Sequence, residues 1–228
     1  MNAPLRLTPG TTGAATPKGQ ATRQIVLSTA IRLVATTGYS ATTVQTVLDD
    51  AGVSRGSLLH HFPNRDLLMV AAAQETMTRM LAGIQEGLKR HADPLKGMSH
   101  YPTILWRVQN DMPARAYTEI QLASRWDAGL GDGLRRAVAE MNDVIVRNME
   151  DLAAHTGLTD VPGLMREVYI LISATQGMAI NRDLMRDRAL AAAALATLRD
   201  RFVTALRARM SRETVRAGDA IVPRNKGG

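Results

Sequence analysis

The stretch TTVQTVLDDAGVSRGSLLHHFPNRDLL, residues 42–68, contains two short helical patterns joined by a tight turn. Thr42 or Thr43 can cap the first helix, which directs its valines inward. In the turn, Gly52 permits a positive φ and the following valine fills the angle between the helices. Ser54 caps a second helix that extends to about residue 61. The pattern predicts a helix-turn-helix, the shape that places a second helix in the major groove of DNA.

The outward residues of the second helix suit contact with a duplex. Arg55, at its start, can reach a guanine edge or a phosphate. Gly56 and Ser57 lack bulk, so the helix backbone can approach DNA closely. Polar donors around both helices suit phosphate oxygens. The candidate DNA-binding residues are Thr42, Thr43, Gln45, Ser54, Arg55, Gly56, Ser57, Leu59, His60, His61 and Arg65.

The chain is basic and contains no cysteine. Its 228 residues include 28 Lys and Arg against 21 Asp and Glu, a net charge of +7. Within residues 1–65, six basic residues face two aspartates, so positive charge gathers around the predicted helix-turn-helix. This balance favours a polyanionic partner, either nucleic acid or an anionic membrane surface. The lack of cysteine excludes disulfides, thiolate metal sites and thiol nucleophiles.

Hydropathy indicates where the protein resides. No apolar run approaches the ~20 residues that a membrane span needs. The first twenty residues lack the apolar core of a secretory signal. We therefore expect a cytoplasmic protein without a membrane partner.

Apolar residues recur at three- and four-residue steps through most of the chain, which predicts an all-α fold. No period-two run of β-branched residues indicates a strand. Both ends are polar, and we expect mobile tails there, the first carrying Arg6 and Lys18 toward a phosphate backbone. One-sided helices are expected from about Thr22 to Gly38, over 64–90 with Asn64 as N-cap, over 134–152 and over 195–206. The expected organisation is a tail at 1–20, a DNA-binding domain at 21–66, a helical body at 67–210 and a tail at 211–228.

The segment from Leu164 to Leu184 differs from the other helices because its apolar residues encircle the helix. A helix that is apolar all round must be covered on more than one side. A second copy of the chain can provide the extra cover, and a central position in a monomeric bundle is the alternative.

Residues 21–72 contain the runs TRQIVLSTAIRL, GYSATTV, AGVSRGSL and HFPNRDLL. These runs resemble the amino-terminal region of the TetR family of bacterial regulators. The resemblance implies a three-helix DNA-binding head, a larger helical body that binds a small ligand, and a homodimer formed through two carboxy-terminal helices. It also implies that the ligand changes the affinity for operator DNA. Beyond about Met69 only the helical pattern agrees, without a residue motif.

Two residues depart from the family pattern. The family usually has Tyr at the position of Leu59, where its hydroxyl meets a phosphate. Leu59 cannot make that bond, although it can contact a thymine methyl group. The family favours Ala at the position of Leu48, where the two helices cross. Base contacts are therefore not carried over from the family to this chain.

Two further sets of residues are expected in the body. Aromatic side chains with polar neighbours are candidates for an apolar ligand pocket, although such residues are more often simple core. The helices 134–152 and 164–184 are expected to pair with those of a second copy. The candidate ligand-binding residues are Trp106, Tyr117, Trp126 and Tyr169. The candidate dimer residues are Leu134, Val138, Met141, Ile145, Val168, Leu171, Ile172 and Thr175.

Other functions are weaker interpretations. His60 and His61 project about 100° apart on a helix, so they do not chelate one metal together, and we expect neither a metal nor a cofactor. No glycine-rich phosphate loop, nucleophile elbow or H-E-x-x-H indicates an enzyme. An architectural DNA-binding protein would not require so large a body. The sequence thus predicts a homodimeric regulator, most readily a repressor, that binds an inverted-repeat operator and is released by an unknown small-molecule inducer.

Overall fold

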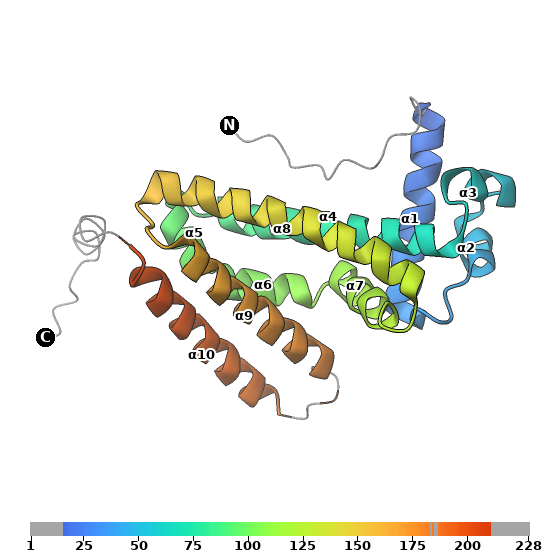
Figure 1. The fold of residues 1–228 in the computed structure, drawn as a ribbon. Helices are drawn as coiled ribbons and strands as arrows, with labels where there is room; N and C mark the ends of the chain where they lie inside the picture. Colours follow the sequence, from blue (N-terminus) through green and yellow to red (C-terminus); the bar gives the residue numbers. More distant parts are fainter. Residues whose placement is uncertain (1–15, 183, 185–186, 211–228) are drawn as a thin grey trace, which may run out of the picture. The chain divides into compact units, whose positions relative to one another are not determined.

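The structure, a computed structural model, describes residues 16–182, 184 and 187–210. These residues form helices and no strand, apart from one isolated antiparallel pairing of Leu158 with Met210, so the predicted all-α fold is confirmed. The helices are α1 (Pro17–Thr37), α2 (Val44–Ala51), α3 (Arg55–His61), α4 (Arg65–Lys89), α5 (Pro94–Ser99), α6 (Tyr101–Gln109), α7 (Met112–Ala123), α8 (Ala128–Thr156), α9 (Val161–Asn181) and α10 (Arg188–Arg207) (Figure 1).

The chain divides into two compact units. The first comprises Met1–Gly83 and Val108–Val144, and the second comprises Ile84–Arg107 and Ile145–Gly228. Three helices, α4, α6 and α8, contribute residues to both units. This division differs from the predicted boundary between residues 66 and 67, because the core around α1–α3 continues into other helices.

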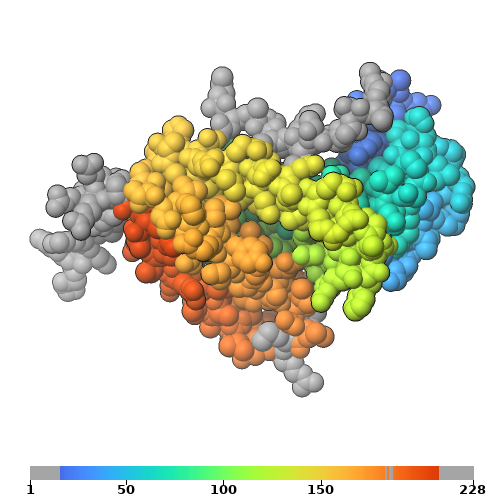
Figure 2. All heavy atoms as spheres, in the orientation of Figure 1, coloured from blue at the N-terminus to red at the C-terminus, as the bar shows by residue number. Residues whose placement is uncertain are grey.

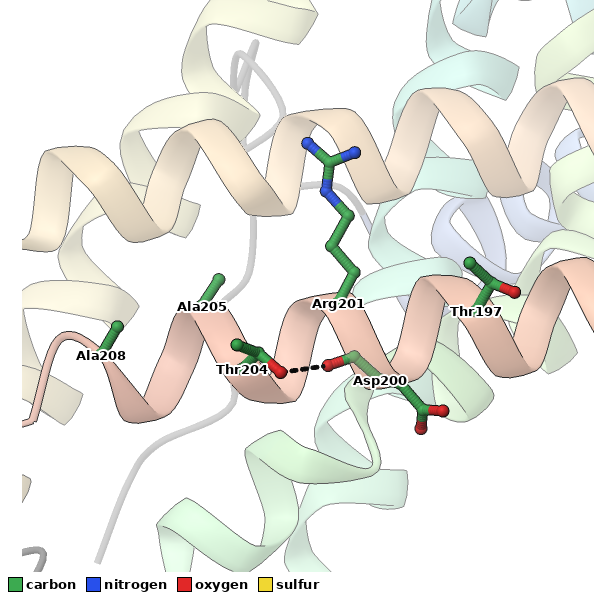
Figure 3. A pocket seen from close by; sticks show the side chains of 6 residues that line it. All are labelled: Thr197, Asp200, Arg201, Thr204, Ala205 and Ala208. Carbon is green, nitrogen blue, oxygen red and sulfur yellow. Dashed lines mark hydrogen bonds between the residues drawn. The ribbon is translucent and has the colours of Figure 1, made fainter.

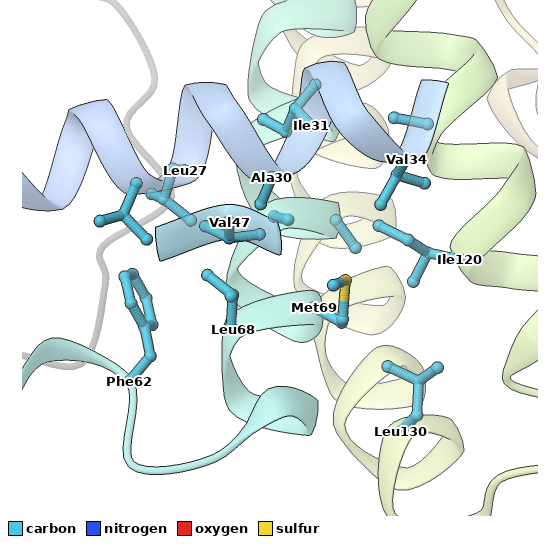
Figure 4. Packing of buried hydrophobic residues seen from close by; sticks show 14 of the residues in the cluster. Leu27, Ala30, Ile31, Val34, Val47, Phe62, Leu68, Met69, Ile120 and Leu130 are labelled. Atoms are coloured by element: carbon cyan, nitrogen blue, oxygen red, sulfur yellow. The ribbon is translucent and has the colours of Figure 1, made fainter. Parts of the chain in front are cut away.

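The core of the first unit is built on α1. This helix buries one face of aliphatic residues, which pack on α2 and, more extensively, on α7 (Figure 4). Met69 of α4, Ile120 of α7 and Leu130 of α8 close the same cluster. Burial of each such side chain stabilises the fold by about 1.5–3 kcal/mol. The helix-turn-helix therefore rests on α4, α7 and α8 and not on a small core of its own.

Polar contacts also join α1 to α4 in this unit. The Glu75 carboxylate accepts from Gln24 Nε2 at 3.1 Å and from Arg79 Nε at 2.9 Å. Arg79 in turn donates to the Ser28 hydroxyl at 3.0 Å. The chain of four residues holds the two helices in one register.

Helix α1 begins earlier than predicted. Thr16 accepts a hydrogen bond from Gly19 N at 3.2 Å and Pro17 stands at the first helical position, where its missing N–H costs nothing. Lys18 is therefore in the first turn of α1 and not in a tail. The expected tail residue Arg6 and the stretch 211–228 lie outside the described residues. The predicted end at Gly38, with φ 87°, and the Asn64 cap of α4 are confirmed.

The second unit has its own core. Met98 of α5, Leu105 of α6 and Leu164 of α9 pack with Phe202 of α10. The rings of Tyr101 and Phe202 stack with centroids 5.8 Å apart. Full burial raises the pKa of Tyr101 to about 12. In Figures 1 and 2, α9 and α10 lie side by side, and their surfaces adjoin on the face toward the viewer.

Arg209 closes the end of this unit. Its carbonyl oxygen accepts from the Thr159 N–H at 2.9 Å and from the Thr159 hydroxyl at 3.1 Å. Its guanidinium lies 3.3 Å from Asp160 and 3.8 Å from Glu167. These contacts tie the α8–α9 loop to the end of α10.

None of the helices in the part of the chain that the structure describes is long and apolar enough to cross a membrane.

Candidate nucleic-acid interface

Local hydrogen bonds shape the turn between α2 and α3. Thr43 and Thr46 form a reciprocal capping box, in which the Thr43 hydroxyl accepts from Thr46 N at 3.1 Å and Thr46 Oγ1 accepts from Thr43 N at 2.9 Å. Gly52 has the left-handed conformation, with φ 63°, and its N–H donates to Leu48 O at 3.0 Å. Ser54 accepts from Ser57 N at 3.2 Å and begins α3. Of the two caps that the sequence allowed, Thr43 and not Thr42 is therefore the N-cap of α2.

Helix α3 presents a polar and open outer side. Only Leu58 is fully buried, whereas Arg55, Gly56 and His60 are exposed. A side chain at Gly56 would meet nothing within 4 Å. Leu59 is 36% exposed, so the apolar side chain that replaces the family tyrosine faces solvent. The exposed side of α3 is therefore open to contact with the major groove of DNA.

Thr42 does not belong to this outer side. Its side chain is fully buried, and its hydroxyl donates to Gly38 O at 2.9 Å. The prediction that Thr42 contacts DNA is therefore wrong for this conformation, because its one proton is already donated within the fold. Thr42 is adjacent to the cap residue Thr43 in the sequence, and this position does not indicate that its side chain is buried.

Arg65 is also occupied inside the fold. Its Nε donates to Thr42 O at 3.0 Å, and its Nη2 donates to Tyr39 O at 2.6 Å. The guanidinium carbon lies 4.0 Å from the centroid of the Tyr39 ring. The sequence predicted a phosphate contact here, whereas the structure shows a side chain that holds the α1–α2 turn.

The two acidic residues of α2 already have partners within the fold. Asp50 pairs with Arg32 of α1, and Asp49 accepts from Gln45 Nε2 at 2.7 Å. The Arg32 charge therefore offsets that of Asp50 toward an approaching phosphate, whereas Asp49 keeps its negative charge. Gln45 keeps its carbonyl oxygen, which is an acceptor, and its second amide proton for other contacts.

His61 lies half-buried at the end of α3. Burial is the main cause that lowers its pKa, and the neighbouring His60 and the Arg23 guanidinium lower it further. Arg23 itself stands over the Phe62 ring at 5.3 Å. A neutral His61 can donate one hydrogen bond but adds no charge. Arg23 was not predicted at this site, because its neighbours here, His61 and Phe62, are 38 and 39 positions away and no periodicity indicates such a contact.

The four candidate ligand-binding aromatics have different surroundings. Trp126 is 90% exposed and Tyr169 is 73% exposed. Trp106 and Tyr117 are half-buried, and burial raises the pKa of Tyr117. Two hollows among the described residues lie along α10, and neither is lined by any of these four. Ligand contact by any of these residues stays a prediction; Trp106 lies in the second unit and Tyr117 in the first, so each is a separate candidate.

The predicted dimer residues divide into two groups. Leu134, Val168 and Leu171 belong to the cores of their own units, and Thr175 is buried, so these four are poorer candidates for contact with a second copy. The half-buried residues are Val138, Met141, Ile145 and Ile172. The outer side of α9 instead carries Tyr169, Ile170 and Ile180, all exposed. The difference has a physical reason: all-round apolarity does not tell which side of a helix faces its own core.

The described residues contain no group of three or more His, Asp or Glu side chains that could hold a metal ion. His60 and His61 contact each other edge-on, with ring centroids 5.3 Å apart. Neither observation indicates a cofactor.

Comparisons with known proteins agree with this geometry. Residues 26–72 match the family described as "Bacterial regulatory proteins, tetR family". The chain is 36% identical over 90 residues to the transcriptional repressor AcnR of Corynebacterium glutamicum, a match that covers 39% of this chain and 46% of that protein. The chain thus spans about half the length of the curated relatives it matches.

Solved structures share the fold beyond the matched region. A TetR-family regulator from a Rhodococcus species superposes with a TM-score of 0.65 at 19% identity, covering 84% of this chain and all of that one. The multidrug binding protein EbrR, solved with imidazole, superposes with a TM-score of 0.55 at 23% identity, covering 81% and 94%. Residues 26–72 are therefore similar to the TetR family of bacterial regulatory proteins, and the rest of the described chain resembles TetR-family structures in fold alone.

Proposed function

We propose that this protein is a DNA-binding transcriptional regulator, and specifically a repressor that acts as a homodimer on an inverted-repeat operator. The single observation that carries the proposal is the outer side of α3. Arg55, Gly56 and His60 are exposed there on a helix whose buried side is anchored by Leu58. The matched relatives are named as repressors or regulators and not as enzymes, which supports the same reading.

The proposed docking assigns different tasks to the polar residues. Arg55 reads a base edge, because it stands at the start of α3. Ser54 uses its oxygen to cap the helix, which leaves its hydroxyl proton for a phosphate. Gly56 lets the backbone approach the duplex. Thr42 and Arg65 act on the fold and not on DNA.

The proposed dimer uses α9 and α10, the last two described helices. Tyr169, Ile170 and Ile180 form an apolar strip on the outer side of α9. Gly177 lies between them, and a Cβ there would meet nothing within 4 Å. An isologous contact along this strip would bury it against its own copy. Two copies of α3 would then reach successive major grooves.

The proposed ligand is a small molecule that lowers operator affinity. EbrR, whose fold the chain shares, is a multidrug binding protein, and Trp106 and Tyr117 are half-buried aromatics in this chain. A ligand at a hundred times its dissociation constant would stabilise the fold by ~2.7 kcal/mol. Operator DNA and ligand must weaken each other's binding by the same factor. We propose a cytoplasmic location for a protein with these partners.

Selection from a random DNA pool tests the function. The wild-type protein should enrich an inverted repeat. Arg55→Ala should relax preference at one symmetric pair of positions by ~1–3 kcal/mol per half-site. Arg90→Ala removes the same charge from the end of α4 and is the matched control, expected to leave the selected sequence unchanged. Retention of DNA without enrichment of any sequence would contradict the proposal and favour an architectural DNA-binding protein.

A further inference from the structure

A hollow of about 500 Å³ in the second unit has no part in the function proposed above. It lies between the α5–α6 region and α10. Its lining consists of Ser99, His100, Thr103, Arg199, Asp200, Val203, Thr204 and Arg207. Its size is within the range of small-molecule sites.

Positive charge dominates this hollow. Arg207 forms no ion pair with any described residue, and Arg199 pairs only with the adjacent Asp200, at 3.3 Å. Both members of that pair are more than half exposed, so the interaction is weak and a ligand can replace it. Two guanidinium groups against one carboxylate leave a net positive site. Guanidinium groups bind oxyanions with paired, charge-assisted hydrogen bonds.

His100 is held in place at the edge of the hollow. Its Nδ1 lies 2.9 Å from Lys96 O and 3.2 Å from Ser99 Oγ, whose own proton is donated to Lys96 O, and its ring stacks on that of His91 with centroids 4.2 Å apart. The Lys96 carbonyl can only accept, so Nδ1 carries the proton. Nε2 is then the atom of His100 left for a ligand.

The hydroxyls of the hollow offer lone pairs. Ser99 Oγ donates to Lys96 O at 2.7 Å, and Thr204 Oγ1 donates to Asp200 O at 2.8 Å. With its proton committed to a backbone carbonyl, Thr204 Oγ1 can only accept further hydrogen bonds. Ser99 Oγ also lies 3.2 Å from the protonated His100 Nδ1, so one of its lone pairs remains for a ligand. Thr103 has no side-chain partner among the described residues. A bare oxyanion satisfies the arginines but not these acceptors, whereas an oxyanion that also carries hydroxyl groups satisfies both.

From this arrangement we propose that the hollow is a binding site for a small oxyanion that carries hydroxyl groups. The anionic group lies against Arg199 and Arg207, and ligand hydroxyls donate to Ser99 and Thr204. Figure 3 shows the same stretch of α10, in which Arg201 points away from Asp200. Arg201 does not line this hollow and is therefore a natural control.

Calorimetric titration of the full chain at low ionic strength tests the proposal, with glycerol phosphate, inorganic phosphate and glycerol as probes. Glycerol phosphate should bind more tightly than inorganic phosphate, and glycerol should not bind. Arg207→Gln should weaken glycerol phosphate binding ~10–100-fold, as expected for the loss of a charged hydrogen-bond partner. Arg201→Gln, which removes the same charge from the same helix, should leave the affinity within about twofold. Thr204→Val should reduce the preference for glycerol phosphate over inorganic phosphate and leave inorganic phosphate unaffected.

Three outcomes overturn the site. No binding of either phosphate at millimolar concentration removes it. Equal losses in Arg201→Gln and Arg207→Gln show only diffuse attraction to a basic helix. Equal affinity for glycerol phosphate and inorganic phosphate in the wild-type protein refutes the role of the hydroxyl acceptors. None of these outcomes bears on DNA binding, so the proposed function stands or falls separately.

Discussion

Arg65 of α4 covers the Tyr39 ring, with its guanidinium carbon 4.0 Å from the ring centroid, and donates to the carbonyl oxygen of the same residue at 2.6 Å. A second donor, Nε, reaches Thr42 O. One side chain thus holds both ends of the α1–α2 turn against the start of α4. The planar fork of Arg suits this double contact, and the point charge of Lys does not.

Arg65→Ala should lower the free energy of unfolding by about 2–3 kcal/mol, because two charge-assisted hydrogen bonds to backbone carbonyls are lost. Urea denaturation measures this loss. Arg65→Lys should recover less than half of it, although it keeps the charge. Tyr39→Phe is the matched control: it keeps the ring and removes a buried hydroxyl that has no partner among the described residues, so stability should be unchanged or higher. An Arg65→Lys protein as stable as wild type would show instead that charge alone matters at this position.

Gly56→Ala should separate stability from DNA binding. Alanine is favoured over glycine in a helix by about 0.5–1 kcal/mol, and the added methyl group would meet nothing within 4 Å. The free energy of unfolding should therefore rise slightly. Affinity for the selected operator should fall, since the methyl group obstructs the approach of α3 to the groove. Thermal denaturation and a fluorescence binding assay report the two effects, and unchanged affinity would remove Gly56 from the interface.

Ile170→Arg should convert the proposed dimer to monomers. Ile170 is 42% exposed on α9, so the chain should stay folded while the charge opposes burial against a second copy. Sedimentation at micromolar concentration measures the state. Val146→Arg, at another exposed apolar position on α8, should leave the dimer intact. If Val146→Arg separates the copies and Ile170→Arg does not, the interface follows α8, one of the two helices that the sequence pattern indicated.

His61 should make the protein less stable as the pH falls. Because its pKa is lowered in the folded state, the unfolded chain binds a proton first, near the ordinary value of about 6.5. Below that pH, protonation of the unfolded chain lowers the free energy of unfolding. This loss of stability grows as the pH falls, until the pH passes the lower pKa of the folded state. His61→Gln should flatten the pH dependence of unfolding below about pH 6.5. His155→Gln, at an exposed position on α8, is the control, and an equal flattening by it would contradict the assignment to His61.

The sequence by itself determined the local architecture of the head. The Ser54 cap, the left-handed Gly52 and the inward Leu58 depend on residues three or four positions apart, and such contacts leave a period in the chain. The same is true of Asn64, which caps α4 as predicted. The sequence also showed that Leu59 replaces the usual tyrosine of the family. Its effect could be predicted because an exposed helix position does not depend on distant neighbours.

Tertiary structure decided which polar groups remain free and which apolar sides stay open. Thr42 and Arg65 were chemically suited to phosphate, but the Thr42 hydroxyl donates to Gly38 O and Arg65 donates to Thr42 O. Residue type alone cannot reveal that Arg65 has a partner 23 positions away. Helix α9 has an apolar residue on every side, so only the packing of its own unit shows that Leu171 is buried and Tyr169 is open. Periodicity records that a face must be covered. The partner that covers it depends on how distant segments meet, which no local pattern encodes.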